Sequence, residues 1–298
     1  MCTAVIKYFE GVGWIGAKNR DRNYKPTINI VQSNRRDVQR LYIDDSVTRW
    51  TEGLNEFGVC ILNTALSVKD DEKDSMVLGG IGSTGVKKRK PSKDGKRIRD
   101  ALYLKTPKTA IDFLVEQKLT GATFVFNENE CYVLEGGYKE KKSDNSERVY
   151  HYKVKKIGKD TTVIRTNHGV YLPFMGYSKD STNPKKIRSR ESSDSRLKIA
   201  KREALKITDP EHLMDAISAT PDSDPFMNPL RRGRLNNKDM ITTGQLMLNA
   251  KSRTMHYRPI YSAMHFDYEK INRESSKTYF EIISNRNLLT FKESFFPT

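Results

Sequence analysis

The sequence has few cysteines and no long apolar run. Its three cysteines, Cys2, Cys60 and Cys131, are widely spaced and form no CxxC pair. This pattern excludes a disulfide framework and a cysteine-rich structural zinc site, and it indicates a reducing compartment. No stretch approaches the about 18 apolar residues that a membrane-spanning helix needs, and residues 1–16 lack a basic segment followed by an apolar run. We therefore expect a cytoplasmic protein with neither a signal peptide nor a membrane span.

The composition is that of a folded domain with an excess of positive charge. Among 298 residues, 36% are hydrophobic, with 14 Tyr and 12 Phe, which is typical of a globular chain rather than a disordered one. There are 53 Lys and Arg residues against 37 Asp and Glu, giving a net charge of +16. This excess favours anionic substrates or partners, although a solvated basic surface explains it equally well. We expect one domain over residues 1–298.

Residues 69–100 differ in character from the rest. A basic run, Lys87 to Lys90, and further lysines and arginines lie among Gly, Ser, Pro and Asp. This composition indicates a basic insertion loop. Such a loop is able to bind phosphate or nucleic acid, but the segment has few aromatic residues to stack on bases, so a solvated insertion is the favoured interpretation.

Hydrophobic periodicity predicts runs of strands separated by a few helices and no internal repeat. Such an order is typical of an α+β layered domain. Strands are expected over residues 2–9, 12–18, 28–32, 39–43, 59–62, 123–127, 131–135, 150–155, 161–166, 244–249, 254–259, 262–266 and 278–283. Helices are expected over residues 107–119, 191–205 (with Ser192, Ser193 or Asp194 as N-cap) and 210–217 (with Asp209 as N-cap), and loops over residues 219–239.

The first three residues, Met1-Cys2-Thr3, carry the most chemical information. Removal of Met1 leaves a thiol and an α-amino group on one residue, which together make a nucleophile and its base. The amine has an ordinary pKa of about 7.7–8 and the thiol one of about 8.5, so modest electrostatic help lets the amine take the thiol proton at neutral pH.

A second segment supplies that help. A turn at Glu10-Gly11 is expected to bring Asn19, Arg20 and Asp21 back to Cys2 on the neighbouring strand. A carboxylate there holds an ammonium group, and a guanidinium lowers the pKa of a thiol. Cys60 and Cys131 lie in apolar strands and are expected in the core.

With these residues assembled, the chain resembles the linear-amide hydrolase branch of the N-terminal-nucleophile superfamily, which includes choloylglycine hydrolases, penicillin V acylases and acyltransferase-like proteins. The matching segments are Met1-Cys2-Thr3, Asn19-Arg20-Asp21, Gly53 to Asn63, and Thr166-Asn167-His168. The segment Ser192 to Arg196 is similar to the serine-rich segment that presents an arginine to the family's active site. The resemblance covers about the first 200 residues, and residues 69–100 and 219–298 match weakly.

The resemblance implies a four-layer αββα sandwich with two antiparallel sheets and Cys2 at one sheet edge. It also implies roles. Cys2 attacks an amide carbonyl through a thioester intermediate, and Asp21 hydrogen-bonds its α-amine. Arg20 or Arg196, or both, favour the thiolate and contact an anionic substrate group. Asn63 and Asn167 are the amide donors, one for the oxyanion and the other for the substrate or the α-amine. No cofactor or metal is implied.

Some features depart from this pattern. Lys18 stands where bile salt hydrolases have their first arginine, and the spacing from Asn55 to Asn63 is shorter than theirs. Specificity for bile salts or penicillins is therefore not carried over.

Several alternatives stay open. His168 offers a Cys-His dyad, but the α-amine already supplies a base, and His168 is expected to pack behind Asn167. The favoured function is amide hydrolysis of a small acyl-amide; an acyltransferase at the same Cys2, or a nucleic-acid-binding protein without catalysis that uses Lys87 to Lys90, is the alternative. The oligomeric state is open, a homo-oligomer included.

Overall fold

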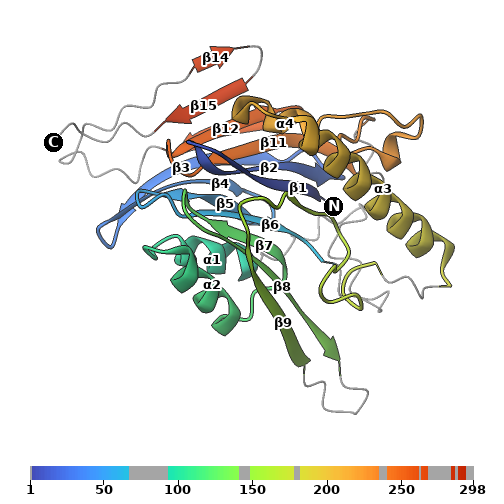
Figure 1. The fold of residues 1–298 in the computed structure, drawn as a ribbon, viewed down its shortest axis with the longest axis horizontal. Coiled ribbons are helices and arrows are strands. Elements are labelled where there is room, and N and C mark those ends of the chain that lie inside the picture. Colours follow the sequence, from blue (N-terminus) through green and yellow to red (C-terminus); the bar gives the residue numbers. More distant parts are fainter. Residues whose placement is uncertain are drawn as a thin grey trace, which may run out of the picture.

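We describe a computed structural model of the chain, covering residues 2–66, 93–140, 148–177, 182–234, 240–261, 263–267, 283–285 and 288–292. The predicted strand over Thr278 to Ile283 and the basic run Lys87 to Lys90 fall wholly or almost wholly outside these ranges. Within them, two large sheets are stacked with helices on both outer faces (Figure 1).

The first sheet holds the start of the chain next to one of its edges. Its strand order is β10-β1-β2-β11-β12-β15-β14, and every described pair in it is antiparallel. The strands are β1 (Cys2–Phe9), β2 (Gly13–Arg22), β10 (Val163–Arg165), β11 (Ile241–Asn249), β12 (Thr254–Pro259), β14 (Ile283–Asn285) and β15 (Leu288–Lys292).

The second sheet has the order β13-β3-β4-β5-β6-β7-β8-β9. Its described strand pairs are antiparallel except at one edge, where β13 runs parallel to β3. The strands are β3 (Thr27–Arg35), β4 (Val38–Asp45), β5 (Thr51–Asn55), β6 (Cys60–Thr64), β7 (Gly121–Phe126), β8 (Cys131–Glu140), β9 (Arg148–Ile157) and β13 (Ala263–Asp267).

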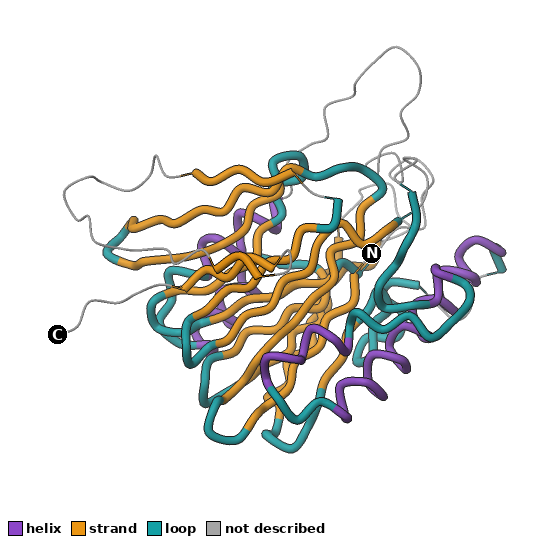
Figure 2. Tube along the Cα trace, turned by 90° about the horizontal axis from the view of Figure 1, so that it is seen from above, coloured by secondary structure: helices purple, strands orange, loops and turns teal. Residues whose placement is uncertain are grey.

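The helices cover the outer faces. They are α1 (Lys93–Ala101), α2 (Pro107–Glu116), α3 (Pro184–Lys206) and α4 (Leu213–Ala216). α1 and α2 pack on the second sheet, and α3 and α4 pack on the first (Figure 1). Figure 2, seen from above, looks down through these layers, so that strands and helices overlap in the view. The predicted four-layer αββα sandwich is confirmed.

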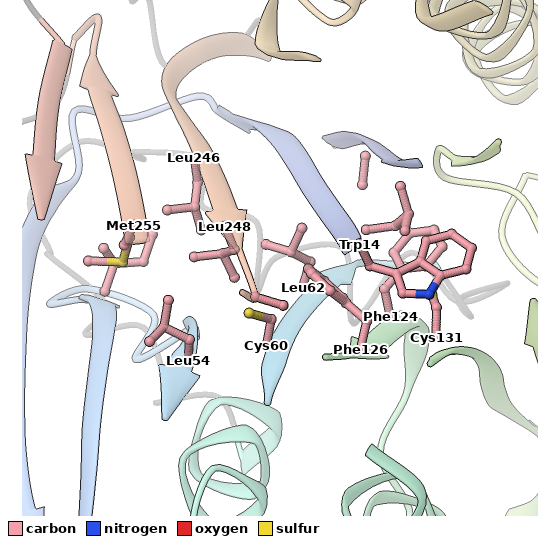
Figure 3. Packing of buried hydrophobic residues seen from close by; sticks show 14 of the residues in the cluster. Trp14, Leu54, Cys60, Leu62, Phe124, Phe126, Cys131, Leu246, Leu248 and Met255 are labelled. Atoms are coloured by element: carbon pink, nitrogen blue, oxygen red, sulfur yellow. The ribbon is translucent and has the colours of Figure 1, made fainter. Parts of the chain in front are cut away.

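The space between the sheets is filled by one apolar cluster. Trp14, Leu246, Leu248 and Met255 of the first sheet face Leu54, Cys60, Leu62, Phe124, Phe126 and Cys131 of the second (Figure 3). Gly16 lies in this interface, where an added Cβ would come within 2.5 Å of Ile6 and 2.7 Å of Leu62. A residue without a side chain is therefore needed there for the sheets to approach closely.

Three predicted boundaries are corrected. The long helix begins at Pro184 rather than 191, because Asn183 accepts a hydrogen bond from the Lys185 N–H as N-cap and Pro184 occupies the first turn. Ser192, Ser193 and Asp194 are therefore interior residues of α3, not caps. The end of the predicted basic loop folds as α1, from Lys93. The predicted helix over residues 210–217 is a one-turn 3₁₀ helix, Pro210–His212, followed by α4, and Asp209 caps it as expected.

Candidate active site

The β1–β2 hairpin brings the second motif back to the start of the chain. Cys2 pairs directly with Arg20, and Thr3 with Asn19, so the predicted return of this segment towards Cys2 is confirmed. Successive side chains of a strand point to opposite faces. Ala4 and Ile6 belong to the cluster between the sheets, so Cys2 lies on that face with Lys18, Arg20 and Arg22.

Asn167 follows the end of β10 and lies next to Cys2. β10 pairs with β1 so that Ala4 lies opposite Arg165, and the chain then continues to Asn167. The Cys2 backbone nitrogen donates to Asn167 Oδ1 at 3.0 Å. The Asn167 amide nitrogen donates to the Ala65 carbonyl at 2.7 Å, which fixes the orientation of the side chain. Asn167 thus contacts the nitrogen that becomes the α-amine when Met1 is removed.

Arg196 reaches the same position from α3. Its Nη1 donates to the Cys2 carbonyl at 2.9 Å and to Thr3 Oγ1 at 3.0 Å, and its Nη2 donates to Asn167 Oδ1 at 3.1 Å. The guanidinium is fully buried. Burial, with nearby Arg231 adding to it, lowers the pKa of Arg196 to about 9, against the opposing effect of Asp21. Arg196 therefore holds the Cys2 main chain from the helix side of the sheet.

Asp21 lies on that helix side, not on the face of the Cys2 side chain. Its carboxylate accepts a hydrogen bond from Thr242 Oγ1 at 2.9 Å and lies 4.0 Å from Arg196 Nη1 and 3.7 Å from Arg231 Nε. Asp21 thus shares a buried cluster with two arginines. Its predicted hydrogen bond to the α-amine stays a prediction.

Arg231 was not expected from the sequence. It is buried, donates to Ser192 Oγ at 2.6 Å, and places its guanidinium 4.1 Å from the centre of the Phe226 ring. It comes from a stretch that reads as a polar loop, in which no periodicity separates a buried arginine from its exposed neighbours.

A buried charge cluster crosses from one sheet to the other beside Cys2. Glu52 of β5 forms ion pairs with both Lys18 and Arg20 of β2, and these three side chains are at most 1% exposed. The Lys18 ammonium also donates to the Asn63 carbonyl. The two cations outweigh burial and hold the pKa of Glu52 below its ordinary value. Glu52 was missed because it is a single acidic residue in a short strand.

The Cys2 thiol lies at the edge of this cluster. Its sulfur is 4.0 Å from Arg22 Nη1. Burial alone would raise the pKa of the thiol. Nearby positive charges more than offset this effect and lower the pKa; Lys18 lowers it more than any other side chain, and Arg22 also lowers it. By contrast, burial raises the pKa of Cys60 and of Cys131 in the apolar core. The site therefore favours a thiolate at Cys2 alone among the three cysteines.

The Asn63 side chain lies on the helix side of the second sheet. Its neighbours Ile61 and Leu62 pack in the helix-side cluster and the inter-sheet cluster respectively, so strand alternation directs Asn63 to the helix side. There its amide nitrogen donates to Thr123 Oγ1 at 2.6 Å and to the Thr120 carbonyl at 3.2 Å. The predicted role of Asn63 as an amide donor to the oxyanion, the substrate or the α-amine stays a prediction.

His168 packs behind Asn167, as expected from the sequence. Its Nδ1 lies 2.9 Å from Ser193 Oγ, and its Nε2 lies 3.3 Å from Asp194. Burial lowers the pKa of His168 to about 4, and the nearby positive charge of Arg190 adds to this shift. The neutral His168 ring is hydrogen-bonded to α3 and so positions the loop that carries Asn167. This geometry does not favour a Cys-His dyad.

Comparison with known proteins gives a likeness of structure only. No family model matches the chain, and no curated protein matches it. A penicillin V acylase from Agrobacterium tumefaciens is 11% identical with a TM-score of 0.43, over 87% of this chain and 83% of that one. Two variants of a conjugated bile acid hydrolase from Clostridium perfringens are each 11% identical with a TM-score of 0.39. They cover 99% and 98% of this chain and 97% of their own. At these values, the likeness assigns the chain neither to a family nor to an activity.

None of the helices in the described ranges is long and apolar enough to span a membrane.

Proposed function

We propose that the protein is a cysteine N-terminal-nucleophile amidohydrolase that cleaves a linear acyl-amide after Met1 has been removed. The observation that carries this proposal is the joint arrangement at Cys2. Its backbone nitrogen is held by Asn167, its carbonyl by Arg196, and its thiol has a lowered pKa. A thiol with a lowered pKa and an amino group on the same residue supply the nucleophile and its general base.

The reaction follows from these parts. The α-amine of Cys2 takes the thiol proton, and the sulfur adds to the amide carbonyl to form a tetrahedral intermediate. The ammonium then returns the proton to the leaving amine, the C–N bond breaks, and the acyl group stays on sulfur as a thioester. A water molecule, deprotonated by the same amine, attacks the thioester and releases the carboxylic acid and the thiol.

The surrounding residues have separate tasks in this scheme. Lys18 and Arg22 stabilise the thiolate, because their positive charges lower its free energy relative to the neutral thiol. Asn167 holds the nitrogen of Cys2, and Arg196 holds its carbonyl. Glu52 keeps Lys18 and Arg20 in place across the sandwich.

The decisive experiment uses the purified protein and a library of acyl-amides with a fluorescent amine as leaving group. Intact mass shows whether Met1 is absent, and an acyl adduct that maps to Cys2 identifies the nucleophile. Cys2→Ala is expected to abolish both adduct and turnover, whereas Cys131→Ala, in the core, is expected to retain them. Turnover that survives Cys2→Ala contradicts the proposal.

Hydrolysis and acyl transfer share this site up to the thioester. Product analysis with an added primary amine separates them, because a transferase gives a new amide and a hydrolase gives the free acid. The nucleic-acid alternative needs a binding measurement with DNA or RNA, since that affinity would fall steeply with salt and would depend on Lys87 to Lys90.

A further inference from the structure

We infer that β9 is a docking strand for an extended acidic segment of another protein. The segment adds to the second sheet as a further strand, held by backbone hydrogen bonds along β9 and by the lysines of β9. This inference does not depend on the proposed function, because β9 belongs to the second sheet and Cys2 to the first.

β9 forms an edge of the second sheet. It pairs with β8 on one side, from Arg148 opposite Glu140 to Ile157 opposite Cys131, and no described strand pairs with it on the other side. The β8–β9 hairpin projects away from the rest of the sandwich (Figure 1). An edge strand presents a row of backbone N–H and C=O groups, which is a template for another strand. The outer edge of β9 is therefore accessible to an extended chain.

The charge of β9 determines which kind of strand fits beside it. Residues 148–159 contain five lysines and arginines and no acidic residue. In the described part of the chain, Lys156 pairs with Glu130 at 3.2 Å, but no carboxylate forms an ion pair with Lys153 or Lys155. Like charges opposite each other destabilise a pair of strands, whereas opposite charges stabilise it. β9 therefore disfavours a second copy of itself and favours an acidic strand.

The two faces of β9 differ, and this difference predicts the sequence pattern of the partner. Ile157 packs between the sheets, and Tyr152 packs on the helix side. Strand alternation puts Lys153 and Lys155 on the first of these faces and Val154, which is 39% exposed, on the second. A neighbouring strand thus meets two lysines on one face and apolar groups on the other. We expect the partner segment to alternate acidic and apolar residues.

The tyrosines of the hairpin favour a peptide over a single-stranded nucleic acid. Bases bind such proteins by stacking on accessible aromatic rings. The rings of Tyr150 and Tyr152 instead stack on each other, with planes 6° apart and centres 6.3 Å apart. Tyr138 also packs against Tyr150, and the Lys118 ammonium lies 5.3 Å from the centre of the Tyr150 ring. These rings are engaged with their neighbours, whereas the backbone edge of β9 is accessible.

Fluorescence anisotropy with two synthetic peptides tests the inference. The first is a labelled peptide of alternating Glu and Val with 10 residues, the length of β9. The second has the same sequence with every backbone nitrogen methylated, so it keeps the charge but has no backbone donor. Comparison of the two separates strand addition from attraction between charges alone.

We expect the first peptide to bind more tightly than the second and to slow hydrogen exchange at the amides of β9. Its affinity should fall with salt, because exposed charges are screened. Lys153→Glu combined with Lys155→Glu should weaken binding by about tenfold, since two attractive contacts become repulsive. Melting temperatures report whether this double variant folds.

The matched control is Lys198→Glu combined with Lys201→Glu. It makes the same change in net charge at two exposed positions of α3, on the other sheet. We expect this variant to bind the first peptide as tightly as the wild type does. An equal loss in both double variants overturns the inference, because it indicates attraction to the net charge of the protein.

Three further results also overturn the inference. The first is equal binding of the two peptides, or no binding of either. The second is a labelled oligothymidylate that binds more tightly than the peptide and depends on Lys153 and Lys155, which assigns the surface to nucleic acid. The third is a concentration-dependent dimer that the Lys153→Glu and Lys155→Glu variant loses, which assigns the edge to a second copy. Each of these results leaves the role proposed for Cys2 unaffected.

Discussion

Lys18 and Glu52 form a fully buried ion pair although they belong to different sheets of the sandwich. Glu52 also pairs with Arg20, so a single carboxylate neutralises two cations in the interior. Glu52→Gln removes the carboxylate that both cations share, and breaking a buried ion pair in this way costs about 3–5 kcal/mol. We expect a loss of that order in the free energy of unfolding, measured with urea. The surface variant Glu203→Gln is expected to lose no more than about 1 kcal/mol.

The pH dependence of the same variant has a definite sign. Because the pKa of Glu52 is lowered in the folded protein, its contribution is fully present above the unfolded value of about 4.3. The contribution is lost as the pH falls through the folded value. The stability difference between the wild type and Glu52→Gln should therefore narrow in acid; a constant difference would count against an ionised Glu52.

Lys18 is expected to set the reactivity of the thiol. With the lowered pKa of Cys2, the rate of alkylation should rise with pH at a midpoint below the ordinary thiol value of about 8.5. Lys18→Met should move this midpoint upward, because the strongest side-chain positive charge acting on the thiol is removed. Peptide mapping checks that Cys60 and Cys131 react far more slowly. An unshifted midpoint in Lys18→Met would show that other charges set the pKa.

Glu135 is expected to hold the loop that carries Asn167. It is buried, pairs with Arg165 across the sandwich, and accepts hydrogen bonds from three successive backbone N–H groups, those of Val170, Tyr171 and Leu172. Glu135→Gln replaces one acceptor oxygen by a donor. We expect faster hydrogen exchange at these three amides, with exchange in α2 unchanged. Uniformly faster exchange would instead indicate global destabilisation.

His168 provides a further pH-dependent prediction. Its pKa of about 4 lies below the unfolded value of about 6.5, so the unfolded chain binds an extra proton between these values. The contribution of His168 is full above about pH 6.5 and is lost as the pH falls towards 4. His168→Gln should flatten the fall in stability over that window.

His212 is the matched control for this measurement. It is exposed, and its hydrogen bond with Asp215 raises its pKa, so its contribution to stability has the opposite sign and is lost as the pH rises.

The alkylation rate of Cys2 should not change in His168→Gln. A large loss would revive the Cys-His dyad.

Local patterns predicted the strands and the return of Arg20 to Cys2, and the family resemblance implied that Asn167 and Arg196 meet Cys2, but neither predicted the electrostatic surroundings. The turn at Glu10-Gly11 fixes the hairpin, and hairpin pairing alone places Arg20 opposite Cys2. Glu52, Arg231 and Glu135 act through contacts between distant segments, and no nearby residue signals them. Their roles depend on how the sheets and helices stack, which periodicity does not specify.

The start of α3 and the direction of the Asn63 side chain both had signals in the sequence. The start of α3 is marked by Asn183-Pro184, the same kind of cap and first-turn pair that identified Asp209-Pro210. The direction of Asn63 follows from strand alternation, since it is the residue after the inward-facing Leu62.

The position of β2 determines when the thiol acquires its chemistry. β2 lies between its hairpin partner β1 and β11, a strand from near the other end of the chain, and Arg20 and Arg22 are paired with β11 residues. β11 lies more than 200 residues after β2 in the sequence, and such distant pairings form slowly. Until β11 pairs with β2, Lys18 and Arg22 are not fixed beside the sulfur. A chain that still lacks β11 is therefore expected to carry a Cys2 thiol whose pKa is closer to the ordinary value.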